Sequence, residues 1–243
     1  MWGSTFFSNK QMITSQERMH QMVLEWGFLP FFKNRIENFS IEEHTPSELW
    51  FTDEQMASPW EWKGPVITEW DCTYGKFFLG KAGFVSLKWL PDFMNWRRSL
   101  YPLSTFPAEA QHILEVLREN ESMLSRELKK ASGFTLTRKR KFGMDGMEDK
   151  EANRHNGASF DKLIAEMQMG THVVIADFEY NFTRNGERYG WGVARYCTPE
   201  ALFGENLLDA CEGRTPQESQ DAILQHLAHI LPNANRKDLE KLI

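Results

Sequence analysis

The sequence predicts an α+β protein in three successive segments, residues 1–104, 105–203 and 204–243. Aromatic residues make up 13% of the chain and are concentrated before Trp96, as expected for an aromatic core or an aromatic-lined cleft. Three helical patterns followed by two strand patterns occupy residues 105–203, and two more helical patterns follow. A chain of 243 residues can bury one large core or two small ones, so we expect one or two domains.

Residues 1–104 predict a mixed region of helices and strands. Met19, Met22, Val23 and Trp26 recur at helical spacing and indicate a helix over 10–26 that ends at Gly27. Short apolar runs bounded by Pro and Gly are typical of strands, and such runs occupy residues 48–51, 65–68 and 83–87. A short helix is expected over residues 90–98.

Residues 105–203 predict three helices and then a β-hairpin. The first helix has its apolar stripe between residues 110 and 117, the second spans 125–131, and a polar loop covers 134–158. Ser159 caps a third helix that ends at Gly170. Strands over 173–178 and 189–196 are joined by a turn at Asn185-Gly186. This order is that of a winged helix, a helix-turn-helix with a β-hairpin wing. One core should include Ala110, Ile113, Leu114, Leu117, Leu128, Leu163, Ile164 and Met167.

Two helices are predicted in residues 204–243, which we call the tail. Thr215-Pro216-Gln217-Glu218 combines a helix cap, a Pro at the first helical position and a Glu two residues later. The helix that follows has Ile223, Leu224, Leu227 and Ile230 on one face, and Asn235 can cap a last helix. The pattern matches the first two helices of another helix-turn-helix unit. Its apolar face must pack on the rest of the chain or on a protein partner.

Composition narrows the classes of function. No apolar run approaches the roughly 20 residues that span a bilayer, no secretory signal is visible, and Cys72, Cys197 and Cys211 are too sparse for a disulfide framework, so we expect a cytoplasmic protein without membrane contact. No cofactor or metal site is expected, because the glycines form no phosphate loop and His226 and His229 lack a third ligand.

The charge pattern points to double-stranded DNA as the partner. The net charge of −6 opposes strong non-specific binding of nucleic acid. Residues 126–162, however, contain ten Lys and Arg against six Asp and Glu, and the wing adds two arginines. The basic run Arg138-Lys139-Arg140-Lys141 is explained equally well as part of a solvated loop. On the third helix, Asp161 and Glu166 would repel the phosphates that line the major groove, so deep reading of that groove is disfavoured. The predicted DNA-binding residues are Arg138, Lys139, Arg140, Lys141, Ser159, Lys162, Arg184 and Arg188.

Candidates for catalysis lie in residues 1–104, which we call the aromatic segment. Excision of a base needs a carboxylate or an activated water and groups that hold a flipped base. The acids that could serve are Glu42, Glu43, Glu61, Glu69 and Asp71, and Trp60, Trp62 and Trp70 could stack on bases. Most acids are solvated and most tryptophans pack in a core, so these residue types do not identify a catalytic residue.

Two stretches resemble the AlkZ/YcaQ family of winged-helix DNA glycosylases. One runs over residues 74–98 and includes Lys81-Ala82-Gly83-Phe84-Val85 and Trp96-Arg97-Arg98; the other runs over 110–203 and includes Phe160-Asp161-Lys162-Leu163 and Thr198-Pro199-Glu200. Trp60-Glu61-Trp62-Lys63-Gly64-Pro65 and Tyr74-Gly75-Lys76 resemble a short AlkZ-related subgroup. The resemblance implies a winged-helix fold and a link to DNA repair.

The chain departs from that family at its catalytic motif. The glycosylases carry a catalytic Gln followed two residues later by Asp or Gln, and no Gln of this chain has either residue at that position. Lys81 stands where the family tends to place a Glu. We therefore expect a winged-helix protein that binds DNA without catalysis. The alternatives are a DNA glycosylase with relocated catalytic residues and a winged helix used for protein–protein contacts.

Overall fold

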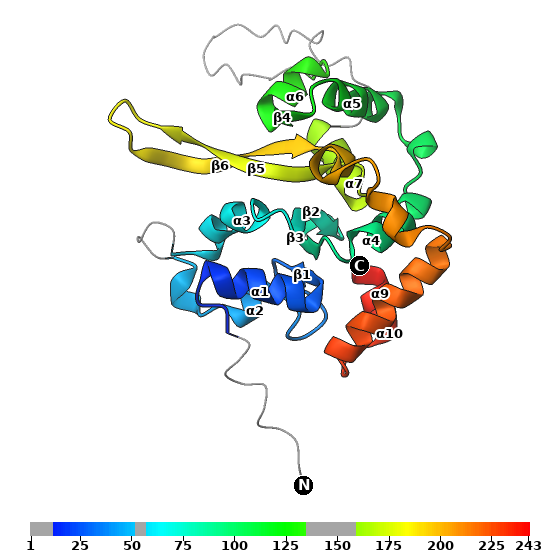
Figure 1. Ribbon diagram of the computed structural model, residues 1–243. Coiled ribbons are helices and arrows are strands. Elements are labelled where there is room, and N and C mark those ends of the chain that lie inside the picture. Colours follow the sequence, from blue (N-terminus) through cyan, green and yellow to red (C-terminus); the bar gives the residue numbers. More distant parts are fainter. Residues whose placement is uncertain (1–11, 52–56, 135–158) are drawn as a thin grey trace, which may run out of the picture.

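The structure is a computed structural model that describes residues 12–51, 57–134 and 159–243. In this part of the chain, six strands form one antiparallel sheet in the order β1-β3-β2-β5-β6-β4 (Figure 1). The strands are β1 (Phe28–Pro30), β2 (Cys72–Phe78), β3 (Lys81–Ser86), β4 (Ser122–Leu124), β5 (Val174–Phe182) and β6 (Arg188–Cys197).

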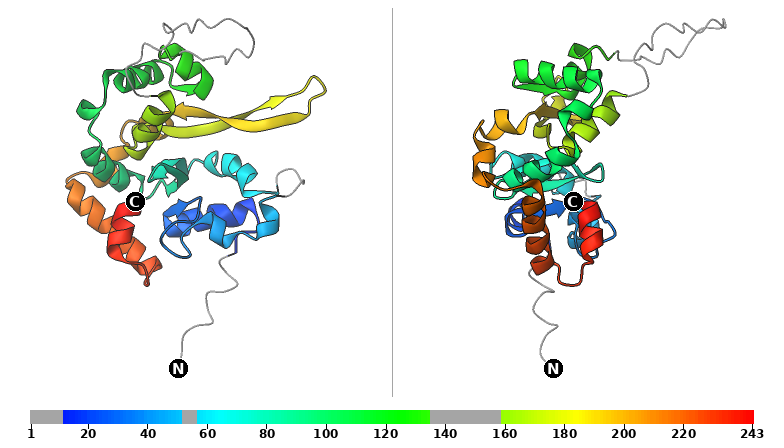
Figure 2. Two further views of the ribbon diagram at one scale, coloured as in Figure 1. Left: turned by 180° about the vertical axis from the view of Figure 1, so that it is seen from behind. Right: turned by 90° about the vertical axis from the view of Figure 1, so that its right-hand side faces the viewer.

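Helices cover the sheet and surround the long β5–β6 hairpin. The α-helices are α1 (Gln16–Trp26), α2 (Ile41–His44), α3 (Pro59–Ile67), α4 (Leu90–Leu100), α5 (Ala108–Glu119), α6 (Ser125–Ala131), α7 (Phe160–Met169), α8 (Pro199–Phe203), α9 (Pro216–Ile230) and α10 (Arg236–Leu242). Short 3-10 helices are η1 (Ser47–Leu49), η2 (Leu103–Thr105) and η3 (Leu207–Cys211). Figure 2 shows α1–α3 on one side of the hairpin and α5 and α6 on the other. Among the described residues, no helix is both long and apolar enough to cross a bilayer.

The first helix shows how local sequence sets an element's bounds. The predicted helix over 10–26 begins at Gln16, because the Ser15 hydroxyl accepts a hydrogen bond from the Arg18 N–H at 3.2 Å. Gly27 ends it with φ 76°. A Cβ at Gly27 would lie 2.4 Å from Trp89 Cδ1, so both the backbone angle and the packing require glycine here.

Two strands predicted from the aromatic segment are wrong. Residues 65–68 lie at the end of α3, where Trp62 and Val66 are four residues apart and both buried. Packing of this helical stripe outweighs the strand preference of the β-branched residues. Residues 48–51 belong to the short helix η1 and to the turn after it. In η1 the Leu49 N–H donates a hydrogen bond to the Pro46 carbonyl at 3.1 Å, which is a helical contact and not a strand contact. The strand predicted over 83–87 and the helix over 90–98 are confirmed as β3 and α4.

The helices and hairpin predicted after residue 105 are confirmed. Helices α5, α6 and α7 lie at the expected positions, and Ser159 caps α7 by accepting the Lys162 N–H at 3.3 Å. The hairpin turns at Gly186, which has φ 81°. Strand β4 was not predicted. All eight apolar residues of the predicted core are buried in one cluster, with Leu163 and Ile164 only 1% and 2% exposed.

The sheet continues from the aromatic segment into the β5–β6 hairpin. Tyr74 of β2 pairs with Ile175 of β5, and the Gln168 side chain accepts a hydrogen bond from the Lys76 N–H at 3.1 Å. Gln168 is fully buried and also donates to the Ile164 carbonyl within α7. Helix α7 is therefore fixed against β2, and one apolar core extends through all three segments of the sequence.

The tail packs on α4. Thr215 and Glu218 form the capping box of α9, and Asn235 caps α10 by accepting the Lys237 N–H at 2.9 Å, as predicted. The apolar face of α9 packs against α4, which accounts for its pattern within this chain. The buried Asp92 carboxylate of α4 accepts hydrogen bonds from Arg214 and from Ser219, the latter at 2.7 Å, and ties the two helices together.

Candidate nucleic-acid interface

The β5–β6 hairpin is the element that projects furthest from the body of the described structure (Figure 1). Its tip contains the exposed Arg184 beside the turn at Asn185-Gly186. Large aromatic side chains are exposed along its outer half: Phe182 is 61%, Tyr189 54% and Trp191 73% exposed. An exposed cation beside exposed aromatic rings is a combination that suits contacts with phosphates and bases.

A bulge in β6 holds Trp191 outward. Asn181 pairs with Tyr189 and Glu179 pairs with Val193, so Gly190, Trp191 and Gly192 all lie opposite Tyr180. Gly190 has φ 73°, and a Cβ at Gly192 would lie 2.8 Å from the Tyr180 ring. Glycine is therefore needed on both sides of Trp191.

The face of the hairpin that lies beside α3 contributes Tyr180 and Arg188 to a group of four polar residues, and α3 contributes Glu61 and Lys63. Arg188 of β6 forms an ion pair with Glu61 of α3 and lies 3.2 Å from the centre of the Tyr180 ring. Lys63 of α3 donates a hydrogen bond to the Trp60 carbonyl at 2.6 Å. We call Glu61, Lys63, Tyr180 and Arg188 the α3–hairpin cluster.

Burial changes the acid–base properties of this cluster. Desolvation lowers the pKa of Lys63 to about 8; the charge of Arg188 adds to this effect and that of Glu61 opposes it. The Lys63 ammonium lies 4.6 Å from the centre of the Phe178 ring, where a cation is still favoured. Burial also raises the pKa of Tyr180, an effect that nearby Glu61 strengthens. The cluster thus combines a carboxylate with an amine that loses its proton readily.

The predicted DNA-binding residues fall into separate places. Arg138, Lys139, Arg140 and Lys141 lie outside the described residues. Ser159 acts as the cap of α7, and the Lys162 side chain is 67% exposed and 3.8 Å from Glu166. Arg184 is exposed at the hairpin tip, whereas Arg188 is in the α3–hairpin cluster. The structure therefore brings together Arg188 and the candidate acid Glu61, which are far apart in the sequence.

The outer face of α7 is not predominantly basic. Asp161 lies 3.9 Å from Lys129, and Glu166 pairs with Lys162. The opposite face of the helix is buried against the core and β2. Neighbouring acids thus offset the positive charge that α7 presents to solvent.

The other candidate acids have structural partners or lie on the surface. Glu43 accepts hydrogen bonds from the Ser40 hydroxyl and the Asn38 N–H, and Glu42 accepts the Lys33 N–H. Asp71 lies 2.8 Å from the imidazole of His20. Glu69 is exposed. Among the described residues, no group of three or more His, Cys, Asp or Glu is placed to hold a metal ion.

The stretch Trp96-Arg97-Arg98, which we call the Trp-Arg segment, has a structural role. Trp96 is buried, and the Arg97 guanidinium, only 8% exposed, donates to the main-chain oxygens of Met169 at 2.7 Å and Ile243 at 2.9 Å. Arg98 forms an ion pair with Glu200 at 2.6 Å. These arginines join α4 to α7, α8 and α10.

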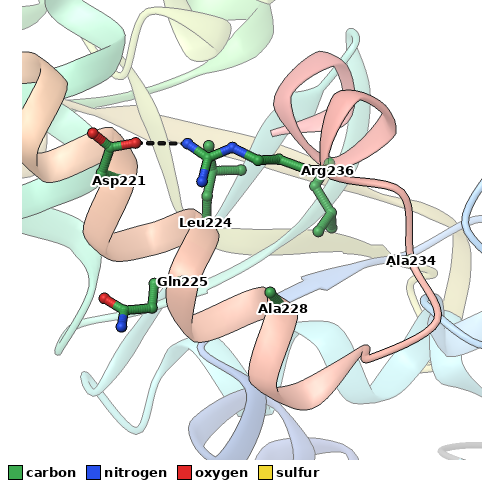
Figure 3. Close-up of a pocket in the computed structure, with 7 residues that line it drawn as sticks. Asp221, Leu224, Gln225, Ala228, Ala234 and Arg236 are labelled. Carbon is green, nitrogen blue, oxygen red and sulfur yellow. Dashed lines mark hydrogen bonds and ion pairs between the residues drawn. The ribbon is translucent and has the colours of Figure 1, made fainter.

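Three hollows lie away from the tip of the hairpin. One of about 360 Å³ lies between α9 and α10, where Arg236 pairs with Asp221 at 2.6 Å (Figure 3). A second, of about 530 Å³, lies between residues 35–38 and the loop that joins α9 to α10. A third, of about 260 Å³, is lined by Trp70, Asp177 and Arg195, among other residues. Trp70 is 52% exposed and has φ 63°, whereas Trp62 is buried and Trp60 is half-buried against Phe31 and Trp50. None of these three hollows is lined by a residue of the α3–hairpin cluster.

The fold and the candidate site describe an α+β protein with a projecting hairpin, which exposes Arg184 and aromatic rings, beside a cluster of ionisable residues. Comparison with protein families identifies the chain more narrowly: it belongs to the family described as AlkZ related, which matches residues 13–243. The match spans the aromatic segment, the hairpin and the tail, so it supports the resemblance seen in the sequence. Searches of curated proteins and of solved structures found no match.

Proposed function

We propose that this protein binds double-stranded DNA through the β5–β6 hairpin, acting as the wing of a winged helix, and serves in DNA repair without the catalytic motif of the AlkZ glycosylases. The observation that carries the proposal is the projecting hairpin with exposed Arg184 and three exposed aromatic rings. Membership of the AlkZ-related family supports it.

The order of elements supports the winged-helix assignment. Helices α5, α6 and α7 are followed by the β5–β6 hairpin, and β4, between α5 and α6, pairs with β6. Such domains place one helix against the DNA groove and the hairpin against the backbone or the minor groove. The acids on α7 make the hairpin the stronger candidate for contact with DNA. The basic run from Arg138 to Lys141 precedes α7 in the sequence and would add phosphate contacts.

The test compares two hairpin variants with a control far from the hairpin. Arg184→Ala removes the exposed cation and Trp191→Ala removes the most exposed ring of the hairpin, while Lys237→Ala changes an exposed residue of α10. Fluorescence anisotropy with a labelled duplex at low salt should show weaker binding for both hairpin variants and no change for the control. Equal affinity of all four proteins would overturn the assignment of the hairpin, and no binding at all would favour a winged helix used for protein contacts.

A DNA glycosylase with relocated catalytic residues is the second candidate. The observation in its favour is that Glu61, an acid of the aromatic segment, lies beside Lys63 and Arg188 next to the hairpin. Its carboxylate is already paired with Arg188, which fits a residue that positions the hairpin better than one that activates water.

We expect no release of alkylated bases above background from alkylated or crosslinked duplex DNA. Loss of a positioned catalytic group typically lowers the rate by roughly 10²–10⁴-fold, and the family's Gln-based pair is missing here. Mass spectrometry of released bases measures this directly. Excision that disappears in Glu61→Gln or Asp71→Asn would establish the glycosylase instead, and excision that survives both would also refute the non-catalytic proposal.

A further inference from the structure

Lys63 differs from an ordinary surface lysine in its surroundings. It is half-buried on α3, and its ammonium lies 4.6 Å from the Phe178 ring centre and 5.7 Å from that of Trp60. Its hydrogen bond to the Trp60 carbonyl holds it against α3, beside Phe178 of β5. Lys88 offers a comparison, because its ammonium lies 5.8 Å from the Trp89 ring but its side chain is exposed.

The environment of Lys63 favours the neutral amine. With its pKa lowered to about 8, a far larger share of Lys63 is uncharged near neutral pH than of an ordinary lysine. A neutral amine attacks carbonyl carbon, and lysines that form imines are commonly activated by desolvation or by a neighbouring cation. For Lys63 the main cause is desolvation; Glu61 opposes it more than the charge of Arg188 adds to it.

We propose that Lys63 captures abasic sites in DNA by forming an imine with their aldehyde. Intact DNA carries no aldehyde, whereas loss of a base lets the deoxyribose open and expose one at C1′. Such a site also leaves a gap in the base stack, which an aromatic ring can fill. Trp191 is exposed for this role, and its ring centre lies 6.2 Å from that of Trp60, the residue whose carbonyl holds Lys63.

The chemistry needs no further reactant. The Lys63 nitrogen forms a bond to C1′ while the carbonyl oxygen takes up a proton. That proton is one of the two on the attacking amine, so the first product is a carbinolamine; its hydroxyl then leaves with the second amine proton as one water molecule, which gives the imine. Borohydride added in the assay transfers a hydride to the C=N carbon, and the nitrogen takes up a proton, so that a stable secondary amine links the chain to the DNA.

The test is borohydride trapping on a duplex with a single abasic site. We compare the wild type with Lys63→Arg, which keeps the charge, with Lys63→Gln, and with the control Lys88→Arg. A covalent adduct should form with the wild type and the control, map to Lys63 in peptide mass spectra and drop at least about tenfold in both Lys63 variants, because neither side chain supplies an amine. Its yield in the wild type should rise between about pH 6.5 and 8.5.

This inference rests on the proposed binding of DNA, so anisotropy with the same duplex is measured in parallel. Binding without an adduct, or an adduct that persists in both Lys63 variants, overturns the inference and leaves DNA binding intact. Absence of binding overturns the proposed function and, with it, capture of abasic DNA. A second measurement without DNA uses formaldehyde and cyanoborohydride. We expect Lys63 to be methylated several-fold faster than Lys88 at neutral pH, and slower methylation of Lys63 would contradict its role as a nucleophile.

Discussion

Replacing Arg97 with Met should destabilise the fold. Arg97 lies in the Trp-Arg segment that resembles the glycosylases, so a catalytic role could be suspected for it. In the structure its guanidinium is buried and donates hydrogen bonds to the main-chain oxygens of Met169 and Ile243. Met has a similar length and an apolar side chain, so the change removes both donors while largely preserving the volume.

The expected loss follows from these two contacts. A hydrogen bond from a charged donor contributes about 1.5–3 kcal/mol, and the two oxygens would be left without these donors. Removal of a buried charge that must be desolvated offsets part of this cost. We therefore expect a decrease of about 3 kcal/mol in the free energy of unfolding.

Urea denaturation followed by circular dichroism measures this change. Arg118→Met on the exposed surface of α5 is the matched control and should change the free energy of unfolding by less than about 0.5 kcal/mol. A decrease of less than about 1 kcal/mol for Arg97→Met would refute the structural role of this arginine.

Two further predictions concern pH and glycine. Burial lowers the pKa of His172 and of His226, so below about pH 6.5 the unfolded chain takes up protons before the folded one and the free energy of unfolding falls. His226→Gln should weaken this dependence in urea titrations at several pH values, and an unaltered dependence would contradict the assignment. Gly192→Ala should cost about 1–3 kcal/mol because its Cβ would meet the Tyr180 ring. Gly64→Ala lies inside α3, where the nearest atoms to an added Cβ are 4.0 Å away, so it should stabilise the fold by up to about 1 kcal/mol in the same assay. If Gly64→Ala destabilises the fold more than Gly192→Ala does, the hairpin does not pack on α3 as described.

The parts of the fold that could be predicted from sequence are those with local signals. The cap at Ser159, the turn at Asn185-Gly186 and the capping box at Thr215 each lie within a few residues, and all three are confirmed. The strand predicted over 65–68 failed because the packing of α3 depends on residues distant in sequence. The pairing of β2 with β5 through Tyr74 and Ile175 has no local signal either.

The candidate site was predictable only in part. The sequence places Arg184 and Arg188 in the predicted wing, whereas Glu61 is one of several acids that residue type alone makes a candidate. Their arrangement was not predictable, because Glu61 and Arg188 meet only when the hairpin folds back over α3. Lys63 could be noticed in the Trp60–Pro65 motif, but its properties follow from the rings and charges that the fold places around it.

The salt dependence of duplex binding tests the central claim most directly. Each phosphate contact contributes about −0.9 to the slope of log K against log salt concentration. We expect measurable binding at low salt that weakens steeply as salt rises. Replacing Arg138, Lys139, Arg140, Lys141 and Arg184 by Ala together should make the slope shallower by up to about 4.5 units. No binding at low salt, or the same slope for both proteins, would contradict the account.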